Sequence, residues 1–147
     1  MSASNRYMNW SGASFTPSPS GTAVAIDGII NCEINRDGEV VRFKGDLAVF
    51  TQLLAMPAQN RVITLTVLNI GKLQTIPLGS RGSIVVNLAD AVNGVTTGGG
   101  GLLFTLGTCL VVNNDAAGAH AKEGTGTISF EGYASDGATD PLVVTAL

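Results

Sequence analysis

IDGIINCEINRDGEVVRFKGD, residues 26–46, is the most informative stretch of the sequence for its fold. On both sides of Asp37-Gly38 every second residue is apolar, so these residues share one face: Ile30, Cys32, Ile34, Val41 and Phe43. A period of two is typical of a half-buried β-strand. Asp-Gly between two such runs favours a tight turn with positive φ. The stretch therefore predicts a β-hairpin that turns at Asp37-Gly38 and buries this face in the core.

Further strands are predicted along the rest of the chain, separated by turn residues. The segments are rich in β-branched residues or alternate between apolar and polar ones, and they cover residues 61–70, 72–78, 83–89, 102–112, 125–134 and 142–147. Asp136-Gly137 and Asp140-Pro141 predict a turn before the last strand. Regular spacing of this kind predicts a mainly β fold, a β-sandwich or barrel.

One short flanking helix is predicted over residues 46–57. Leu47, Phe50, Leu53 and Leu54 fall on one face at helical spacing. Asp46 is placed to cap the first turn, and a proline at position 57 ends the last one.

The composition indicates a protein whose surface is covered by partners. Hydrophobic residues make up 45% of the 147 residues and charged residues only 13%, and the mean hydropathy is +0.32. A soluble monomer of this size usually carries more surface charge. The net charge of −3 and the pI of about 4.9 disfavour a protein that grips nucleic acid through its phosphates. No apolar run reaches the roughly 18 residues of a membrane-spanning helix, and the first residues lack the pattern of a secretory signal.

The first 21 residues read as an extended N-terminal arm, followed by a single β domain over residues 22–147. The arm is polar apart from Tyr7, Trp10 and Phe15. Aromatic residues in an extended segment gain most from burial across an interface. These aromatic residues are therefore predicted to dock on a neighbouring subunit, although such a composition also fits a mobile terminus.

The sequence contains few residues that could form a catalytic, cofactor-binding or metal site. His120 is the only histidine, and no nucleophile motif accompanies it. Cys32 and Cys109 fall in apolar strands and are predicted to be buried free thiols. The glycines at 98–101 lack the lysine of a phosphate-binding loop and do not open a helix. No catalytic, cofactor-binding or metal-binding residue is predicted.

Two segments resemble the tail tube proteins of long-tailed bacteriophages. They are DGEVVRFKGD at residues 37–46 and EGTGTISFEGYASDGATDPLVV at residues 123–144, in which a Gly-Thr-rich strand with a phenylalanine precedes an Asp-Gly turn. The similarity lies in the order of the strands and turns and in their residue types, over roughly residues 22–147.

This resemblance implies a structural virion protein rather than an enzyme. It implies a β-sandwich or barrel whose inner strands join those of neighbouring copies into a barrel that runs around a hexameric ring. Rings would stack into a tube through which DNA leaves the capsid without specific binding, in contact with other tail proteins and without a membrane. Assembly would take place in the host cytoplasm. The interface candidates are Tyr7, Trp10, Phe15, Leu47, Phe50 and Leu147.

The lumen of such a tube is predicted to carry few cations, because Lys or Arg on the wall would hold the passing phosphates. The polar face of the predicted hairpin supplies the lumen candidates Glu33, Asp37 and Glu39, and the same face could equally be solvated on the outside of a ring. Other functions remain open: another phage component on a similar fold, such as a capsid decoration or tail terminator protein, or a soluble β-sandwich that binds a ligand. Oligomeric state separates them.

Overall fold

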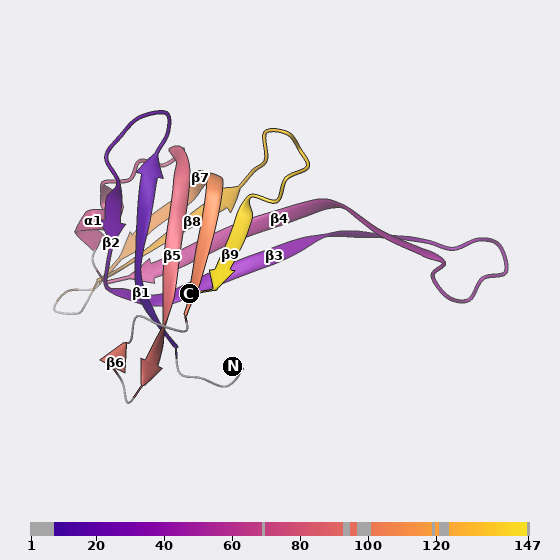
Figure 1. Cartoon of the computed structure of the whole chain (residues 1–147). Helices are drawn as coiled ribbons and strands as arrows, with labels where there is room; N and C mark the ends of the chain where they lie inside the picture. The colour runs from indigo at the N-terminus through magenta and orange to yellow at the C-terminus, as the bar shows by residue number, and fades with distance from the viewer. Residues whose placement is uncertain are drawn as a thin grey trace.

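The computed structural model of this chain describes residues 8–68, 70–92, 95–96, 101–118, 120 and 124–146. The fold is mainly β with one short helix in the described part, which confirms the predicted fold class (Figure 1). The elements are β1 (Met8–Pro17), β2 (Val24–Ile26), β3 (Ile29–Phe43), β4 (Leu53–Val67), α1 (Ile70–Gln74), β5 (Arg81–Val92), β6 (Val95–Thr96), β7 (Leu102–Ala117), β8 (Thr125–Gly132) and β9 (Leu142–Ala146).

The strands form one antiparallel sheet in the order β2-β1-β5-β7-β8-β4-β3. β7 is long enough to take successive neighbours on one side: its first half pairs with β9 and its second half with β8. β6 pairs with the end of β5. The predicted strands at residues 83–89 and 102–112 lie within β5 and β7, and those at residues 125–134 and 142–147 correspond to β8 and β9, with β8 ending two residues earlier than predicted.

The sheet curls over a single apolar core. The rings of Phe15 in β1 and Phe130 in β8 lie 5.3 Å apart between centroids. β5 and β7 separate these strands, which would place them about 14 Å apart in a flat sheet with about 4.8 Å between strands. Curling brings the inner faces together, and both rings are buried with their neighbours. β2 and β3 stay at the ends of the strand order, so the sheet does not close into a barrel.

The predicted turn at Asp37-Gly38 is wrong, because β3 runs through both residues without a break. Gly38 faces Gln59 on β4, and a Cβ on Gly38 would lie 2.5 Å from the carbonyl oxygen of Ala58. Glycine at position 38 therefore allows the two backbones to approach closely. It is not there to adopt a positive φ. The chain turns later, over residues 44–52, where the amide of Gln52 donates to the carbonyl of Phe43 at 2.8 Å.

The predicted helix over residues 46–57 is also wrong. Residues 44–52 form the turn, and β4 begins at Leu53 opposite Phe43. From Leu53 onward the segment gains ladder hydrogen bonds with β3, interrupted by a register shift between Glu39 and Val41, whereas an isolated short helix is marginal in water.

The helix of this fold lies instead in α1, where a strand over residues 72–78 is predicted. Leu73 inserts into the core from α1. The side-chain amide of Asn114 on β7 donates to the carbonyls of Leu73 at 3.0 Å and Ile76 at 2.8 Å. A distant strand thus supplies the partners that the carbonyls at the end of the helix need.

The predicted N-terminal arm is, over residues 8–17, a strand inside the sheet. β1 pairs with β2 on one side and with β5 on the other. Phe15 is 1% exposed and belongs to the core, so its prediction as a subunit anchor is wrong. A register shift between Trp10 and Gly12 breaks the alternation of β1, which hides the strand in the sequence.

Candidate assembly surfaces

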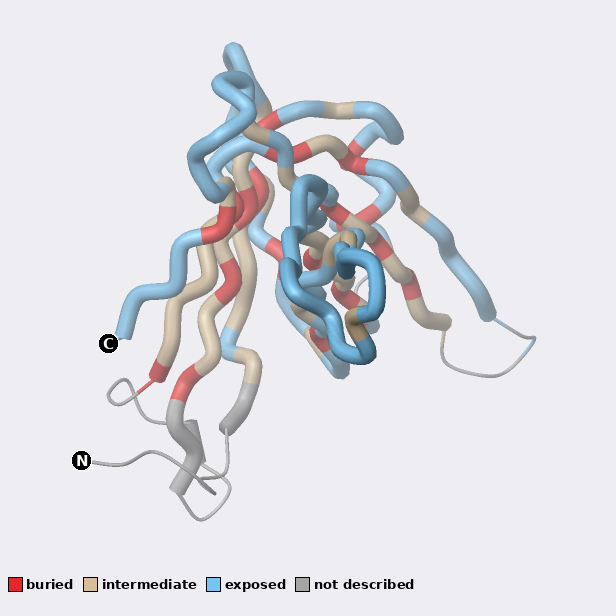
Figure 2. The backbone as a smooth tube through the Cα atoms, turned by 90° about the vertical axis from the view of Figure 1, so that its right-hand side faces the viewer, coloured by how far each residue is buried: buried red, intermediate tan, exposed pale blue. Residues whose placement is uncertain are grey.

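β3 and β4 leave the body together and form a long projecting ribbon (Figure 1). β4 pairs with β8 only over Val62–Val67, whereas its first part pairs with β3 alone. We call residues 36–61 the arm and residues 44–52 the arm tip. Residues 51–60 are all exposed, and in Figure 2 the tip stands as an exposed loop in front of the partly buried body.

The arm exposes apolar side chains on both of its faces. Leu53 and Leu54 are adjacent in β4 and so point to opposite faces, yet they are 59% and 62% exposed. Further exposed apolar residues follow along the arm and its tip: Val40, Phe43, Leu47, Val49, Phe50 and Met56. A two-stranded hairpin is marginally stable alone in water, and a contiguous apolar surface marks an interaction site. The arm has the properties of an element that is covered on assembly.

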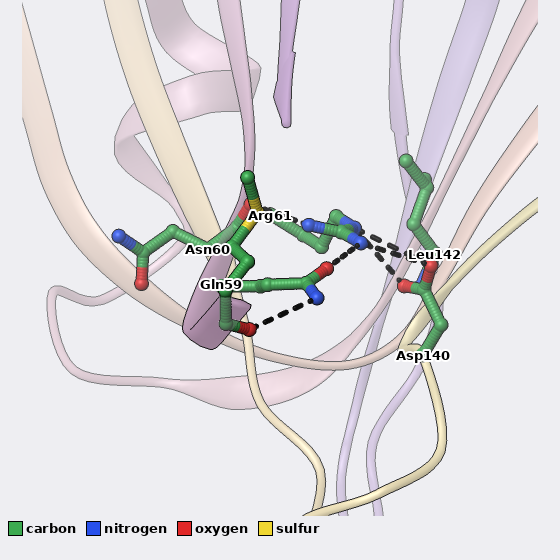
Figure 3. A network of polar contacts seen from close by, with 6 residues as sticks. Gln59, Asn60, Arg61, Asp140 and Leu142 are labelled. Atoms are coloured by element: carbon green, nitrogen blue, oxygen red, sulfur yellow. Dashed lines mark hydrogen bonds and ion pairs between the residues drawn. The ribbon is translucent and has the colours of Figure 1, made fainter. Parts of the chain in front are cut away.

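A polar network fixes the base of the arm to the loop between β8 and β9 (Figure 3). The guanidinium of Arg61 donates to the carboxylate of Asp140 at 3.2 Å and to the side-chain oxygen of Gln59 at 2.8 Å. Asp140 also accepts from the backbone amide of Leu142 at 3.0 Å. This amide and, after it, Arg61 lower the pKa of Asp140. The network links the base of the arm to this loop at the protein surface.

The predicted turn at Asp136-Gly137 is present in the same loop. Asp136 accepts hydrogen bonds from the hydroxyl and the amide of Thr139 and from the amide of Ala138, and these lower the pKa of Asp136 to about 2. Gly137 has a φ of 72°, which glycine adopts without strain. The loop and the base of the arm border a hollow of about 440 Å³.

A polar face covers the outer side of β3, β4, β8 and the second half of β7. Cross-strand partners form rows on this side, because residues opposite each other in a ladder share a face. Three rows define the polar face: Glu33, Thr64, Ser129 and Asn113; Asn31, Thr66, Thr127 and Asp115; Asn35, Val62, Glu131 and Leu110. None of these residues is Lys or Arg, and the hydroxyls of Thr64 and Ser129 lie 3.1 Å apart.

The lumen candidates all lie in β3 and are exposed, but they do not lie in one place. Glu33 belongs to the polar face, whereas Asp37 and Glu39 lie opposite Asn60 and Ala58 in the arm. Sequence reasoning missed Asp115 and Glu131, which the sheet brings to the same face. Glu131 ends the alternating pattern of β8, which was an available signal, whereas Asp115 lies among exposed residues at the end of β7 and carries no such signal. Neither pattern tells which strands are neighbours.

An apolar hollow opens at the base of the arm, on the side of β1. It has a volume of about 500 Å³ and is lined by Trp10, Ile34, Arg36, Leu88 and Phe104. The rings of Trp10 and Phe104 lie 6.1 Å apart between centroids. β1, β3, β5 and β7 each contribute to its wall, so only the folded sheet creates it.

The interface candidates are dispersed. Trp10 lines the apolar hollow, and Leu47 and Phe50 are exposed at the arm tip, although the helix predicted to present them is absent. Tyr7 and Leu147 lie outside the described residues.

The described residues show no arrangement of a metal site. No group of three His, Cys, Asp or Glu side chains gathers there to hold an ion. The predicted free thiols are confirmed: Cys32 and Cys109 are buried and unpaired with each other. Burial raises the pKa of both thiols to about 12. In the same part of the chain, no helix has the length and apolar character needed to cross a membrane.

The fold has a counterpart among solved structures. No protein-family model matches the sequence, and no curated protein matches it. The chain superposes over 99% of its length on 97% of a chain in the sixfold-symmetrised cryo-EM structure of the anti-feeding prophage (AFP) baseplate, with a TM-score of 0.56 and 13% identity. At this identity the similarity concerns the fold alone, and the protein thus shares its fold with a chain of this baseplate structure.

Proposed function

We propose that the protein is a structural virion component, the major tail tube protomer, which forms stacked hexameric rings around a channel for DNA. The observation that carries the proposal is the polar face, which has a free edge on either side. The outer edge of β3 has no ladder partner among the described strands, and residues 113–117 of β7 pair with β8 alone. Strand addition between copies would continue the polar face around a ring.

The charge of the polar face suits the wall of a DNA channel. Glu33, Asp115 and Glu131 lie on it, and its rows hold no cation. Because such a wall has no cations to replace the counterions condensed on DNA, it does not bind the passing phosphates. If the curved sheet faces the channel with this side, the duplex slides past it.

The exposed apolar arm and the superposed fold support the same proposal. An arm with apolar residues on both faces needs covering, which neighbouring subunits would provide. The superposed chain belongs to a sixfold-symmetrised baseplate, which is consistent with rings of six copies.

Negative-stain electron microscopy of the purified protein, with its mass measured by light scattering, tests this proposal. We expect sixfold rings or tubes that form as the concentration rises. A protein that stays monomeric at every concentration would contradict the proposal and favour a soluble binding module. Stable trimers without rings would favour a capsid decoration protein.

A further inference from the structure

We propose that the arm tip of one copy docks in the apolar hollow of a second copy. The inference rests on the proposed function, because it names the contact through which copies of a self-assembling chain engage one another.

The arm tip is an apolar plug at the end of the arm. Leu47, Val49 and Phe50 are its most exposed apolar side chains. The side-chain oxygen of Gln52 accepts from the amide of Gly45 at 2.6 Å and closes the loop behind them. Docking would remove these apolar side chains from water, which favours a contact at the tip.

The apolar hollow is a suitable receptor for such a plug. Trp10 and Phe104 form an aromatic wall, and Ile34 and Leu88 complete the apolar lining. The hollow has a volume of about 500 Å³ and is widely open to solvent, so its walls are accessible to a projecting loop. Tryptophan and arginine are both enriched among the few residues that carry most of the binding energy of protein interfaces.

The charges of the two surfaces are complementary. Arg36 borders the apolar hollow and is the only charged residue in its lining. Asp46 lies in the tip beside Leu47. A docked tip would bring this carboxylate near the guanidinium, which favours one orientation of the plug.

The tip of a chain is far from the hollow of the same chain. Ile34 and Arg36 line the hollow where the arm begins, and the tip follows Phe43. The intervening strand spans about 23 Å at about 3.3 Å per residue. The contact must therefore join two copies through different surfaces, and such head-to-tail contacts propagate into rings or filaments.

Cysteine cross-linking between two variants tests the contact. Leu47→Cys places a thiol at the tip, and Leu88→Cys places one in the hollow. In an equimolar mixture, oxidised glutathione accepts the two electrons released as the thiols lose their protons and join in a disulfide. We expect a covalent dimer from this mixture. The native thiols do not compete, because both are buried and have a pKa of about 12.

The matched control is Leu78→Cys mixed with Leu88→Cys. Leu78 is an exposed leucine in the connection after α1, away from the arm, so we expect at least tenfold less dimer from this mixture. Circular dichroism checks that each variant folds, and Ile34→Cys replaces Leu88→Cys if the latter does not.

A charge exchange gives an independent readout. Asp46→Arg and Arg36→Asp should each raise the concentration needed for assembly several-fold, and the doubly exchanged chain should assemble as the unmodified one does. A merely structural role of Arg36 beside Asp140, whose pKa it helps to lower, would not produce this recovery.

The outcomes separate this inference from the proposed function. Sixfold rings without the Leu47–Leu88 cross-link would overturn the inference and leave the proposed function standing. Cross-linked chains that never form sixfold rings would support the inference and contradict the tube. A protein that neither assembles nor cross-links would overturn both.

Discussion

Phenylalanine takes opposite roles in this protein according to which strands surround it. Phe15 and Phe130 pack against each other in the core with their rings tilted by 31°, whereas Phe43 is 52% exposed on the arm. All occur in segments that alternate or nearly alternate, so their local patterns look alike. The difference arises because β1 and β8 have neighbours that curl over them, while the outer half of β3 has only β4.

Phe130→Ala should therefore lower the free energy of unfolding by about 3–5 kcal/mol, the usual effect of emptying an aromatic core position. The matched control, Phe43→Ala, should change it by less than about 1 kcal/mol in the unassembled protein, since little buried area is lost. Urea unfolding followed by circular dichroism measures both values. Equal losses in the two variants would mean that the arm packs on the body.

Two adjacent asparagines on β7 face different surroundings. Asn114 donates from its side-chain amide to carbonyls at the end of α1, whereas Asn113 belongs to the outward row with Ser129. The bulge between Val111 and Asn113 turns Asn114 toward the helix.

Asn114→Asp should destabilise the fold by about 1–3 kcal/mol, because a carboxylate has no proton to give and faces two carbonyl oxygens. Asn113→Asp has the same chemistry on the open polar face and should change stability by less than about 1 kcal/mol. Thermal unfolding at pH 7 compares them. A fall in stability confined to Asn113→Asp would contradict the proposed role of Asn114.

At the scale of elements, β3 and β4 each combine a part inside the sheet with a part that projects. Residues 62–67 of β4 lie between β3 and β8, while residues 53–60 have a ladder partner on one side only. Buried side chains occur only in the first of these parts. Local stability should differ accordingly along one continuous strand.

Hydrogen exchange followed by mass spectrometry should show this division. In the unassembled protein, amides of residues 53–60 should exchange at least tenfold faster than those of residues 62–67. In the assembled protein, the exchange of residues 53–60 should slow, because neighbours cover the arm. Slow exchange of the arm in the monomer would contradict its need for a partner, and residues 62–67 serve as the internal control.

At the scale of the whole molecule, the polar face gathers residues from distant parts of the chain. Glu33, Asp115 and Glu131 come from β3, β7 and β8 and lie on one side of the sheet. Their common role as a wall for DNA is part of the proposed function and concerns the assembly, not the monomer.

Glu33→Lys combined with Glu131→Lys should convert this wall into one that binds DNA. Assembled particles of the variant should retain a short duplex at low salt and release it as salt rises, because phosphate contacts release counterions. Unmodified particles should not retain it. A filter-binding titration measures the difference.

Two control variants locate the effect. Glu33→Gln with Glu131→Gln removes the acids without adding cations and should not retain the duplex. Ser20→Lys with Thr22→Lys adds lysines on the exposed loop before β2 and should leave the interior of a tube unchanged. Equal DNA binding by the loop variant would show that the polar face does not line the channel.

The alternation of polar and apolar residues determined much of this protein from its sequence alone. The fold class, the positions of β5, β7, β8 and β9, the turn at Asp136 and the burial of Cys32 and Cys109 all follow from local periodicity and residue type. These features need only a core on one side of a strand, which any arrangement of the sheet provides.

Only the tertiary structure decided which strands are neighbours, and the wrong predictions arise there. Gly38 lies close against the backbone of Ala58, Phe15 is a core residue, and Leu47 and Phe50 lie at the tip of an arm. Periodicity cannot distinguish a turn from a close approach, or a buried face from one that awaits a partner. These properties depend on contacts between residues far apart in the chain, which form only when the sheet has curled.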